Sequence, residues 1–284
     1  MSAAMCIPPE IMSHITEGMN GSAAWYAYDT RVIRRNCSLF KKIPYIQTAI
    51  HFATMANVHT EFLRIIREEG INVFVNSEEH MTAVESAGFS GNEIVFAASA
   101  LDEDTMRRLA LRNVCINLDS LGQLDRWRRL FPKKPVGIRC NIGGTVTPRK
   151  TRGGYFIGKE SRLGLTLDEI RSLKGDTAIN GLHLYVGTDI LDNDYFIECY
   201  EQIAALAGLF PLLSYLDFGG GFGIDDTGKR RFDIEEYGVR VAALMRSVSN
   251  RMDRQLKLIL EPGRIIGGEA GYFICRVTDV KIRE

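Results

Sequence analysis

The segment DFGGGFG (217–223) contains a run of three glycines with a clear chemical use. Successive glycines leave backbone N–H groups open to close approach, so these groups can surround an anion without help from any side chain. The run follows an apolar stretch typical of a buried strand. The alternative interpretation is a tight turn between a strand and a helix that binds nothing.

A second motif, EPGR (261–264), follows a later apolar run. A carboxylate at a strand end, Glu261, can hold a ring nitrogen protonated, while Gly263 and Arg264 can present an N–H group and a guanidinium to a phosphate. A surface turn with a salt bridge is the alternative. Because both motifs follow the last two predicted strands, where barrels often bind phosphate, together they favour a phosphate site.

The segment HLYVGTD (183–189) offers an aromatic ring, a glycine turn and the hydroxyl of Thr188. His183 and Tyr185 are two residues apart on a predicted strand, so their side chains are expected to face the same way. For His183 itself, a core histidine within the strand is favoured over a catalytic role.

Short apolar or β-branched runs predict eight strands, at 46–52, 71–75, 93–97, 114–118, 136–140, 181–185, 215–218 and 256–260. Amphipathic stretches between them predict helices whose apolar faces are Phe62, Leu63, Ile65 and Ile66; Met106, Leu109 and Leu111; and Ile197, Tyr200, Ile203, Ala204 and Leu206. Alternating strands and helices imply a parallel sheet, and eight such units match a (β/α)8 TIM barrel. An open, doubly wound sheet is the alternative. The long insertion 141–160 is expected to form a mobile loop at the barrel mouth.

The two ends of the chain do not fit the barrel. WYAYD (25–29) and AGYFICRVTDVK (270–281) each predict a strand with few partners left in the chain. We interpret them as terminal strands of a mostly missing β-domain. The expected division is an N-terminal segment over 1–30, the barrel over 31–266, and the start of a truncated C-terminal β-domain over 267–284.

Composition excludes several kinds of partner. Basic and acidic residues number 35 each, so no global field favours nucleic acid or an anionic membrane. No apolar run approaches the ~18 residues of a membrane span, and the start lacks the pattern of a signal peptide. The six cysteines form no CxxC pair, which favours reduced, buried thiols over disulfides or a metal site. We expect a cytoplasmic protein without a metal.

Ten segments together resemble the ornithine, diaminopimelate and arginine decarboxylase family, in the family's order and approximate spacing. They are YAYD (26–29), IHFATMAN (50–57), NSEEHMTAVESAGF (76–89), IVFA (94–97), INLDS (116–120), IRCN (138–141), SRLG (161–164), HLYVGT (183–188), DFGGGFG (217–223) and EPGR (261–264). The specific part of the match is the glycine run GGGF (219–222), followed some forty residues later by EPGR (261–264). The resemblance implies a (β/α)8 barrel joined to a β-domain, pyridoxal phosphate as cofactor, an amino-acid-like small-molecule substrate, and head-to-tail dimers.

The resemblance also implies roles for individual residues. The cofactor phosphate would lie against Gly219, Gly220, Gly221, Thr188, Gly263 and Arg264. Glu261 would pair with the pyridine nitrogen, Tyr185 would stack on the ring, and Arg139 would lie near the cofactor.

The most consequential departure from the family is Met55, in Ala53-Thr54-Met55-Ala56-Asn57, where the family has the lysine that binds the cofactor covalently. A thioether cannot form that bond or return a proton to the product. Three other positions differ from the ornithine decarboxylase pattern: Phe74 and His80 replace acidic residues, and Tyr185 replaces a histidine. With the C-terminal domain mostly missing, we expect the family's C-terminal cysteine and aspartate, which complete the partner's site, to be missing as well.

Lys150 and Lys159, in the loop after the fifth strand, are the alternative tethers, but a flexible loop holds such a bond poorly in line. The neighbouring Arg149, Lys150 and Arg152 read as a solvated loop tip. We therefore expect pyridoxal phosphate, if bound, to be held non-covalently. Three hypotheses remain: a decarboxylase-like enzyme, a catalytically inactive paralogue with a binding or regulatory role, and a truncated remnant. The expected assembly is a homodimer or a dimer with a related full-length chain.

Overall fold

The computed structural model describes residues 24–147, 154, 156–224 and 232–282, together with residues 9, 12 and 13. Its strands are β1 (Ala24–Tyr28), β2 (Thr48–Ala53), β3 (Asn72–Val75), β4 (Ile94–Ala98), β5 (Cys115–Leu118), β6 (Val136–Asn141), β7 (Leu165–Thr166), β8 (Ile179–His183), β9 (Tyr215–Asp217), β10 (Lys257–Leu260) and β11 (Gly271–Cys275). Its helices are α2 (Thr30–Lys41), α3 (Thr60–Glu68), α4 (Glu78–Ser86), α5 (Glu103–Leu111), α6 (Leu121–Leu130), α7 (Leu167–Ser172), α8 (Asn193–Leu206), α9 (Ile234–Arg251) and α10 (Arg264–Gly267), with short 3-10 turns η1 (Thr54–Ala56), η2 (Gly91–Glu93) and η3 (Ala207–Leu209).

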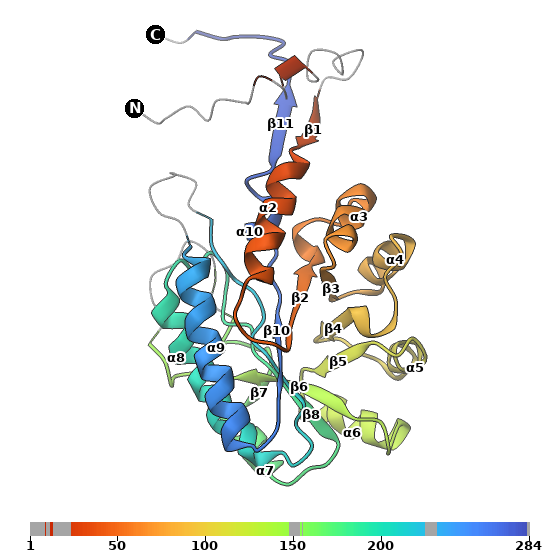
Figure 1. Ribbon diagram of the computed structural model, residues 1–284. Helices are drawn as coiled ribbons and strands as arrows, with labels where there is room; N and C mark the ends of the chain where they lie inside the picture. Colours follow the sequence, from red (N-terminus) through yellow and green to blue (C-terminus); the bar gives the residue numbers. More distant parts are fainter. Residues whose placement is uncertain are drawn as a thin grey trace.

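Eight parallel strands close into a ring in the order β2-β3-β4-β5-β6-β8-β9-β10. Two pairings complete it: β5 meets β6 through Leu118 opposite Ile138, and β10 meets β2 through Leu260 opposite Ile50. Helices surround the ring (Figure 1). This confirms the (β/α)8 barrel and excludes the open sheet.

Short polar side chains fix where the helices around the barrel begin. Each accepts a hydrogen bond from a backbone amide in the first helical turn: Asp29, Ser77, Asp102, Ser120, Thr166, Asp192 and Asp233. Such a cap satisfies one of the amide groups that a helix leaves unpaired at its start. The caps therefore fix the point at which each loop above the barrel ends.

The Tyr215 ring lies inside the barrel, in space left free by two strand glycines. An ideal Cβ added to Gly181 would lie 1.8 Å from Tyr215 Cζ, and one added to Gly137 would lie 2.1 Å from the Tyr215 hydroxyl. Glycine in a strand often marks such a close approach. The Tyr215 ring packs in a small inner cluster with Phe74, Val95 and other residues, separate from the main core between sheet and helices.

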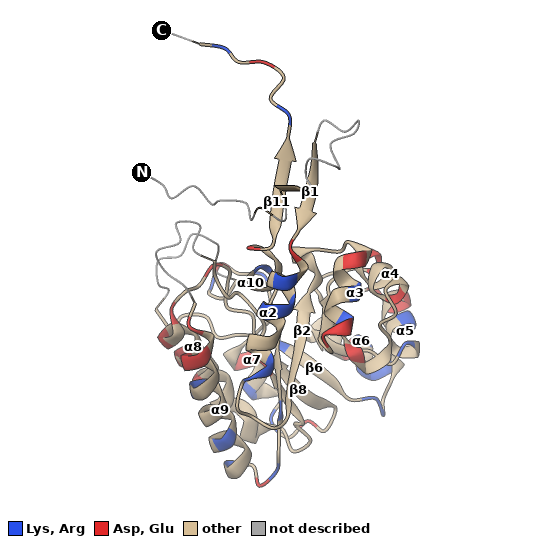
Figure 2. Cartoon of the chain, turned by 45° about the horizontal axis from the view of Figure 1, so that its top comes forward, with Lys and Arg blue, Asp and Glu red and all other residues tan. Residues whose placement is uncertain are grey.

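β1 and β11 form an antiparallel two-stranded sheet, the terminal ribbon, in which Tyr26 lies opposite Phe273. The ribbon projects beyond the barrel and carries no charged side chain (Figures 1 and 2). The two predicted terminal strands, for which few partners were expected in the chain, pair with each other and with no other described strand. The strand predicted over residues 270–281 is shorter than expected, because β11 ends at Cys275.

Three other local predictions need correction. Leu111 is 87% exposed, whereas Met106 and Leu109 of the same predicted face are buried. Residues two apart on a helix point in nearly opposite directions, so Leu109 and Leu111 cannot share a face. The two-residue strand β7 was not predicted, and the sixth barrel strand ends at His183, before Tyr185.

The described cysteines are free thiols. Cys37, Cys140 and Cys199 are buried, as predicted, whereas Cys275 is exposed on the ribbon. None of the helices in the described part of the chain has the length and apolar character needed to cross a bilayer.

Candidate functional site

A cavity of about 930 Å³ opens at the carboxyl ends of the barrel strands. Nine of the ten predicted site residues line it: Met55, Arg139, Tyr185, Thr188, Gly220, Gly221, Glu261, Gly263 and Arg264. The tenth, Gly219, lies just outside the lining. The structure therefore gathers residues from five strand ends around one space large enough for a small-molecule ligand.

The glycine loop, residues 219–221, packs so tightly that side chains cannot enter. A Cβ on Gly220 would lie 2.1 Å from Glu261 O, and a Cβ on Gly221 would lie 2.2 Å from Gly187 O. The Gly219 amide donates to Asp217 Oδ1 at 3.0 Å. Within the described residues, the amides of Gly220 and Gly221 donate to no acceptor. Two unused N–H groups at the cavity wall are the donors that a phosphate requires.

Arg264 adds a positive charge beside this loop. Its Nη2 lies 3.3 Å from Thr188 Oγ1 and also pairs with the carboxylate of Asp189. Gly263, one residue earlier, lies so close to β2 that an added Cβ would be 3.3 Å from Ala53 Cβ. The loops after β8, β9 and β10 thus form one polar wall of the cavity.

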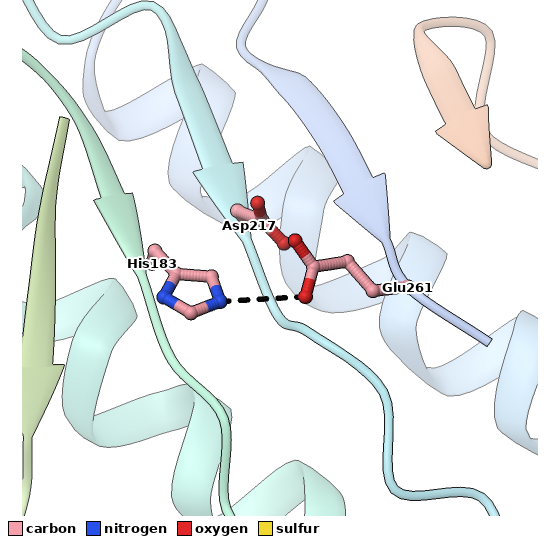
Figure 3. A group of neighbouring side chains, drawn as sticks. All are labelled: His183, Asp217 and Glu261. Carbon is pink, nitrogen blue, oxygen red and sulfur yellow. Dashed lines mark ion pairs between the residues drawn. The ribbon is translucent and has the colours of Figure 1, made fainter. Parts of the chain in front are cut away.

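Three buried polar residues, His183, Asp217 and Glu261, face one another at the base of this wall; we call them the buried triad (Figure 3). His183 Nε2 lies 3.4 Å from Glu261 Oε2. Glu261 is only 3% exposed; its Oε1 meets no partner with hydrogen-bond geometry in the described structure and lies next to the Asp217 carboxyl (Figure 3). A buried carboxyl oxygen without a partner at a cavity wall suits a protonated ring nitrogen.

Burial favours the uncharged form of each member of the triad. It raises the pKa of Glu261 to about 8 and lowers the pKa of His183 to about 4. Burial, reinforced by the neighbouring Glu261, also raises the pKa of Asp217 well above its ordinary value. The contact dashed in Figure 3 therefore joins mainly neutral groups at pH 7, although its geometry is that of an ion pair.

Each member of the buried triad offers one possible metal-ligand atom, and these three atoms lie within 4.8 Å of one another. A cation would have to displace protons from two buried carboxyls whose pKa values are raised. The unpaired Glu261 oxygen, the free glycine amides and an aromatic wall instead match a flat, phosphorylated, nitrogen-containing ring.

Aromatic side chains form the sides of the cavity. The Tyr185 ring stacks on Phe156 with centroids 5.2 Å apart, and Phe74 stacks on His183 at 6.1 Å. Both His183 and Tyr185 line the cavity, which confirms that they face the same way. Arg139 is largely buried and lies 3.7 Å from Asp119 Oδ1, so a compensated cation lies near the triad.

Met55 is in η1, at the end of β2, and its side chain is 46% exposed into the cavity mouth. The neighbouring Thr54 hydroxyl is buried, donates to Phe74 O at 2.9 Å and lies 2.8 Å from His80 Nδ1. No lysine occurs among the described residues that line the cavity. Lys159 is exposed outside the lining, and residues 148–153, with Arg149, Lys150 and Arg152, lie outside the described residues.

Sequence reasoning gave too little weight to two members of the triad. His183 was read as a core residue, and it is indeed buried, but it also lines the cavity beside Glu261. Asp217 was not singled out. Its position two residues before the glycine run, at the end of a predicted strand, was the available signal.

Residues 30–268 match the family model "Pyridoxal-dependent decarboxylase, pyridoxal binding domain". Among curated proteins, the chain is 28% identical to diaminopimelate decarboxylase of Methanothermobacter thermautotrophicus over 276 residues, covering 90% of this chain and 63% of that protein. It is 26% identical to diaminopimelate decarboxylase of Escherichia coli K12 over 274 residues, covering 92% and 63%. The chain thus spans less than two thirds of the length of these relatives.

Solved structures show the same fold at lower identity. Diaminopimelate decarboxylase from Helicobacter pylori, complexed with L-lysine, superposes with a TM-score of 0.77 at 19% identity and covers 92% of this chain and 68% of that one. The arginine decarboxylase of Paramecium bursaria Chlorella virus, bound to agmatine, gives a TM-score of 0.77 at 16% identity, covering 98% and 74%.

Proposed function

Because residues 30–268 form a pyridoxal binding domain of the pyridoxal-dependent decarboxylase family, we propose that the chain binds pyridoxal phosphate non-covalently. We also propose that it does not decarboxylate amino acids on its own. The main support for this proposal is the position of Met55 at the mouth of a cavity whose described lining contains no lysine. Among the described residues, the cavity keeps the donors that suit the cofactor but offers no side-chain amine to tether it.

Each part of the cofactor has a matching group in the cavity. The unused amides of Gly220 and Gly221, with the Thr188 hydroxyl and Arg264, would hold the phosphate. The Tyr185 ring, supported by Phe156, would lie against the pyridine ring. The carboxyl of Glu261, which lines the cavity, would accept the hydrogen of the ring nitrogen.

Pyridoxal phosphate supplies an electron sink for the electron pair left on a substrate when CO2 departs. The described lining of the cavity contains no lysine that would move the proton. Thioether sulfur neither bonds covalently to an aldehyde nor carries a proton at neutral pH, so Met55 can only pack against a ligand.

We extend two further features to this chain as proposals. The ligand beside the cofactor is an amino-acid-like small molecule, in keeping with relatives whose structures contain L-lysine and agmatine. The terminal ribbon belongs to a second, β-rich unit over residues 1–30 and 267–284, and assembly occurs as a homodimer or with a related full-length chain. Both faces of the ribbon carry apolar residues, and an isolated two-stranded sheet has only marginal stability in water. These two facts support a partner that covers the ribbon.

Borohydride reduction tests the proposal. The chain is equilibrated with pyridoxal phosphate, its absorbance and binding heat are recorded, and its intact mass is measured before and after reduction. We expect saturable binding without a mass increase. A single covalent cofactor at one lysine would overturn the non-covalent binding, and absence of binding at millimolar cofactor would overturn the proposed function.

An active decarboxylase is the second candidate, favoured by the retained Glu261 beside the cavity. Its test is release of CO2 from diaminopimelate, lysine, ornithine and arginine in the presence of the cofactor. Turnover of any of these by the unaltered chain would replace the first proposal with this one.

A further inference from the structure

The loop after β8 places a carboxylate directly on the cation of the proposed phosphate site. One nitrogen of Arg264, Nη2, contacts both Thr188 Oγ1 and Asp189 Oδ1. A guanidinium Nη carries two hydrogens, so these contacts use both. Thr188 and Arg264 line the cavity, whereas Asp189 lies behind them, outside the lining.

The backbone holds Asp189 in this position. Its φ is +59°, in the left-handed region that aspartate and asparagine adopt more readily than most residues. The next residue is tied to the glycine loop, since Ile190 N donates to Gly221 O at 3.0 Å and Gly223 N donates to Ile190 O at 2.8 Å. The Asp189 side chain is 18% exposed, so water screens its charge only partly.

We propose that Asp189 is a specificity-determining residue that lowers the positive charge of the phosphate site, so that the site discriminates against a doubly charged phosphate. This inference rests on the proposed function. Arg264 is the one cation among the residues proposed to hold the phosphate, and Asp189 offsets its charge. Any phosphate that reaches Arg264 also meets the carboxylate bound to the same nitrogen, and the repulsion grows with the charge of the phosphate.

Phosphate monoesters gain their second negative charge near pH 6, so the effect of Asp189 is expected to depend on pH. The other ionisable groups that face the site among the described residues are Glu78 of α4, Arg139 of β6, Arg162 of the segment before β7, His183 of β8, Tyr185 of the loop after β8, Asp217 of β9 and Glu261 after β10. These groups are common to the wild-type chain and a variant at position 189. Their titration therefore cancels when the two affinities are compared at one pH.

The test compares the wild-type chain with Asp189→Asn, which keeps the shape and the tolerance for positive φ but removes the charge. Binding of pyridoxal phosphate and of inorganic phosphate is measured by titration calorimetry at pH 5 and pH 7.5. We expect the variant to bind both ligands about three- to tenfold more tightly at pH 7.5, with a smaller gain at pH 5. Asp194→Asn is the matched control, because Asp194 is 63% exposed and pairs with Arg240 away from the cavity; its affinities are expected to match the wild type.

The outcomes separate this inference from the proposed function. If the wild-type chain binds pyridoxal phosphate but Asp189→Asn binds equally or more weakly, Asp189 has another role and the inference fails while the proposed function stands. An equal gain at both pH values would also overturn it, because charge would not be the cause. If neither chain binds either ligand, both proposals fail.

Discussion

The phenol of Tyr215 donates a 2.7 Å hydrogen bond to Asn117 Oδ1 inside the barrel, beneath the cavity. Asn117 Nδ2 in turn lies 3.4 Å from Asp217 Oδ2. A chain of polar contacts thus links the packed interior of the barrel to the buried triad.

Tyr215→Phe is expected to destabilise the fold by about 1–3 kcal/mol, because Asn117 Oδ1 would remain buried without its donor. Urea unfolding monitored by circular dichroism measures the change. Tyr26→Phe on the terminal ribbon is the control, since Tyr26 is 65% exposed, and it should leave the unfolding free energy unchanged. Equal stability of Tyr215→Phe and the wild type would show that the hydrogen bond contributes nothing.

Glu261→Gln should change how stability depends on pH. The folded-state pKa of Glu261, about 8, lies above the ordinary value of 4.5. An acid with a raised folded-state pKa stabilises the protein fully below its unfolded-state pKa, and this contribution is lost as the pH rises toward the folded-state pKa. The wild-type chain should therefore lose stability between about pH 4.5 and pH 8, and the variant should lose less.

Unfolding free energies of both chains at pH 5 and pH 9 measure this difference. Relative to the wild type, Glu261→Gln should gain on the order of 2–4 kcal/mol between these two pH values. Glu61→Gln, an exposed substitution on α3, should follow the wild-type pH profile. If the profiles of Glu261→Gln and the wild type run parallel, Glu261 is not held in its protonated form.

Met55→Lys should restore covalent attachment of the cofactor without restoring robust decarboxylation. The new amine would stand at the cavity mouth, where Met55 is 46% exposed. Reduction with borohydride should add one cofactor mass to this variant and none to the wild type. Release of CO2 should remain far below that of a full-length relative, because Phe74 and His80 still stand where the ornithine decarboxylase pattern has acidic residues. Robust turnover by Met55→Lys alone would show that the barrel is sufficient for catalysis.

Gly220→Ala should weaken cofactor binding at least about tenfold, because the new Cβ would lie 2.1 Å from Glu261 O and push the glycine loop off its neighbour. Titration calorimetry with pyridoxal phosphate measures the loss. Gly208→Ala is the control: an added Cβ there meets nothing within 4 Å, so the affinity should be unchanged. Wild-type affinity in Gly220→Ala would mean that the loop is not part of the site.

The periodic features of the fold were accessible from the sequence. All eight barrel strands were predicted within two residues or so of their bounds, because each is a short apolar run followed by turn residues. Closure could not be derived from such runs, since an open sheet has the same alternation. Only the resemblance and the pairing of β5 with β6 decide it.

For the loops around the cavity, too, some features could be predicted from the sequence and others could not. Gly220, Gly221, Glu261 and Arg264 were recognisable because their motifs are contiguous in the chain. The contact between Asp189 and Arg264 was not, since it joins two loops far apart in sequence. Likewise, Gly181 gives no local sign that it makes room for Tyr215, the first residue of the next strand, β9.

The ring and the terminal ribbon are both completed by joining early and late segments: β2 pairs with β10, and β1 pairs with β11. During synthesis on a ribosome, the edges of β2 and of each new last strand must therefore stay unpaired until β10 has emerged. Such edges can pair with other nascent chains. Slow translation ahead of residue 257, or a shortage of chaperones, should therefore lower the yield of this protein more than that of a helical protein of equal length.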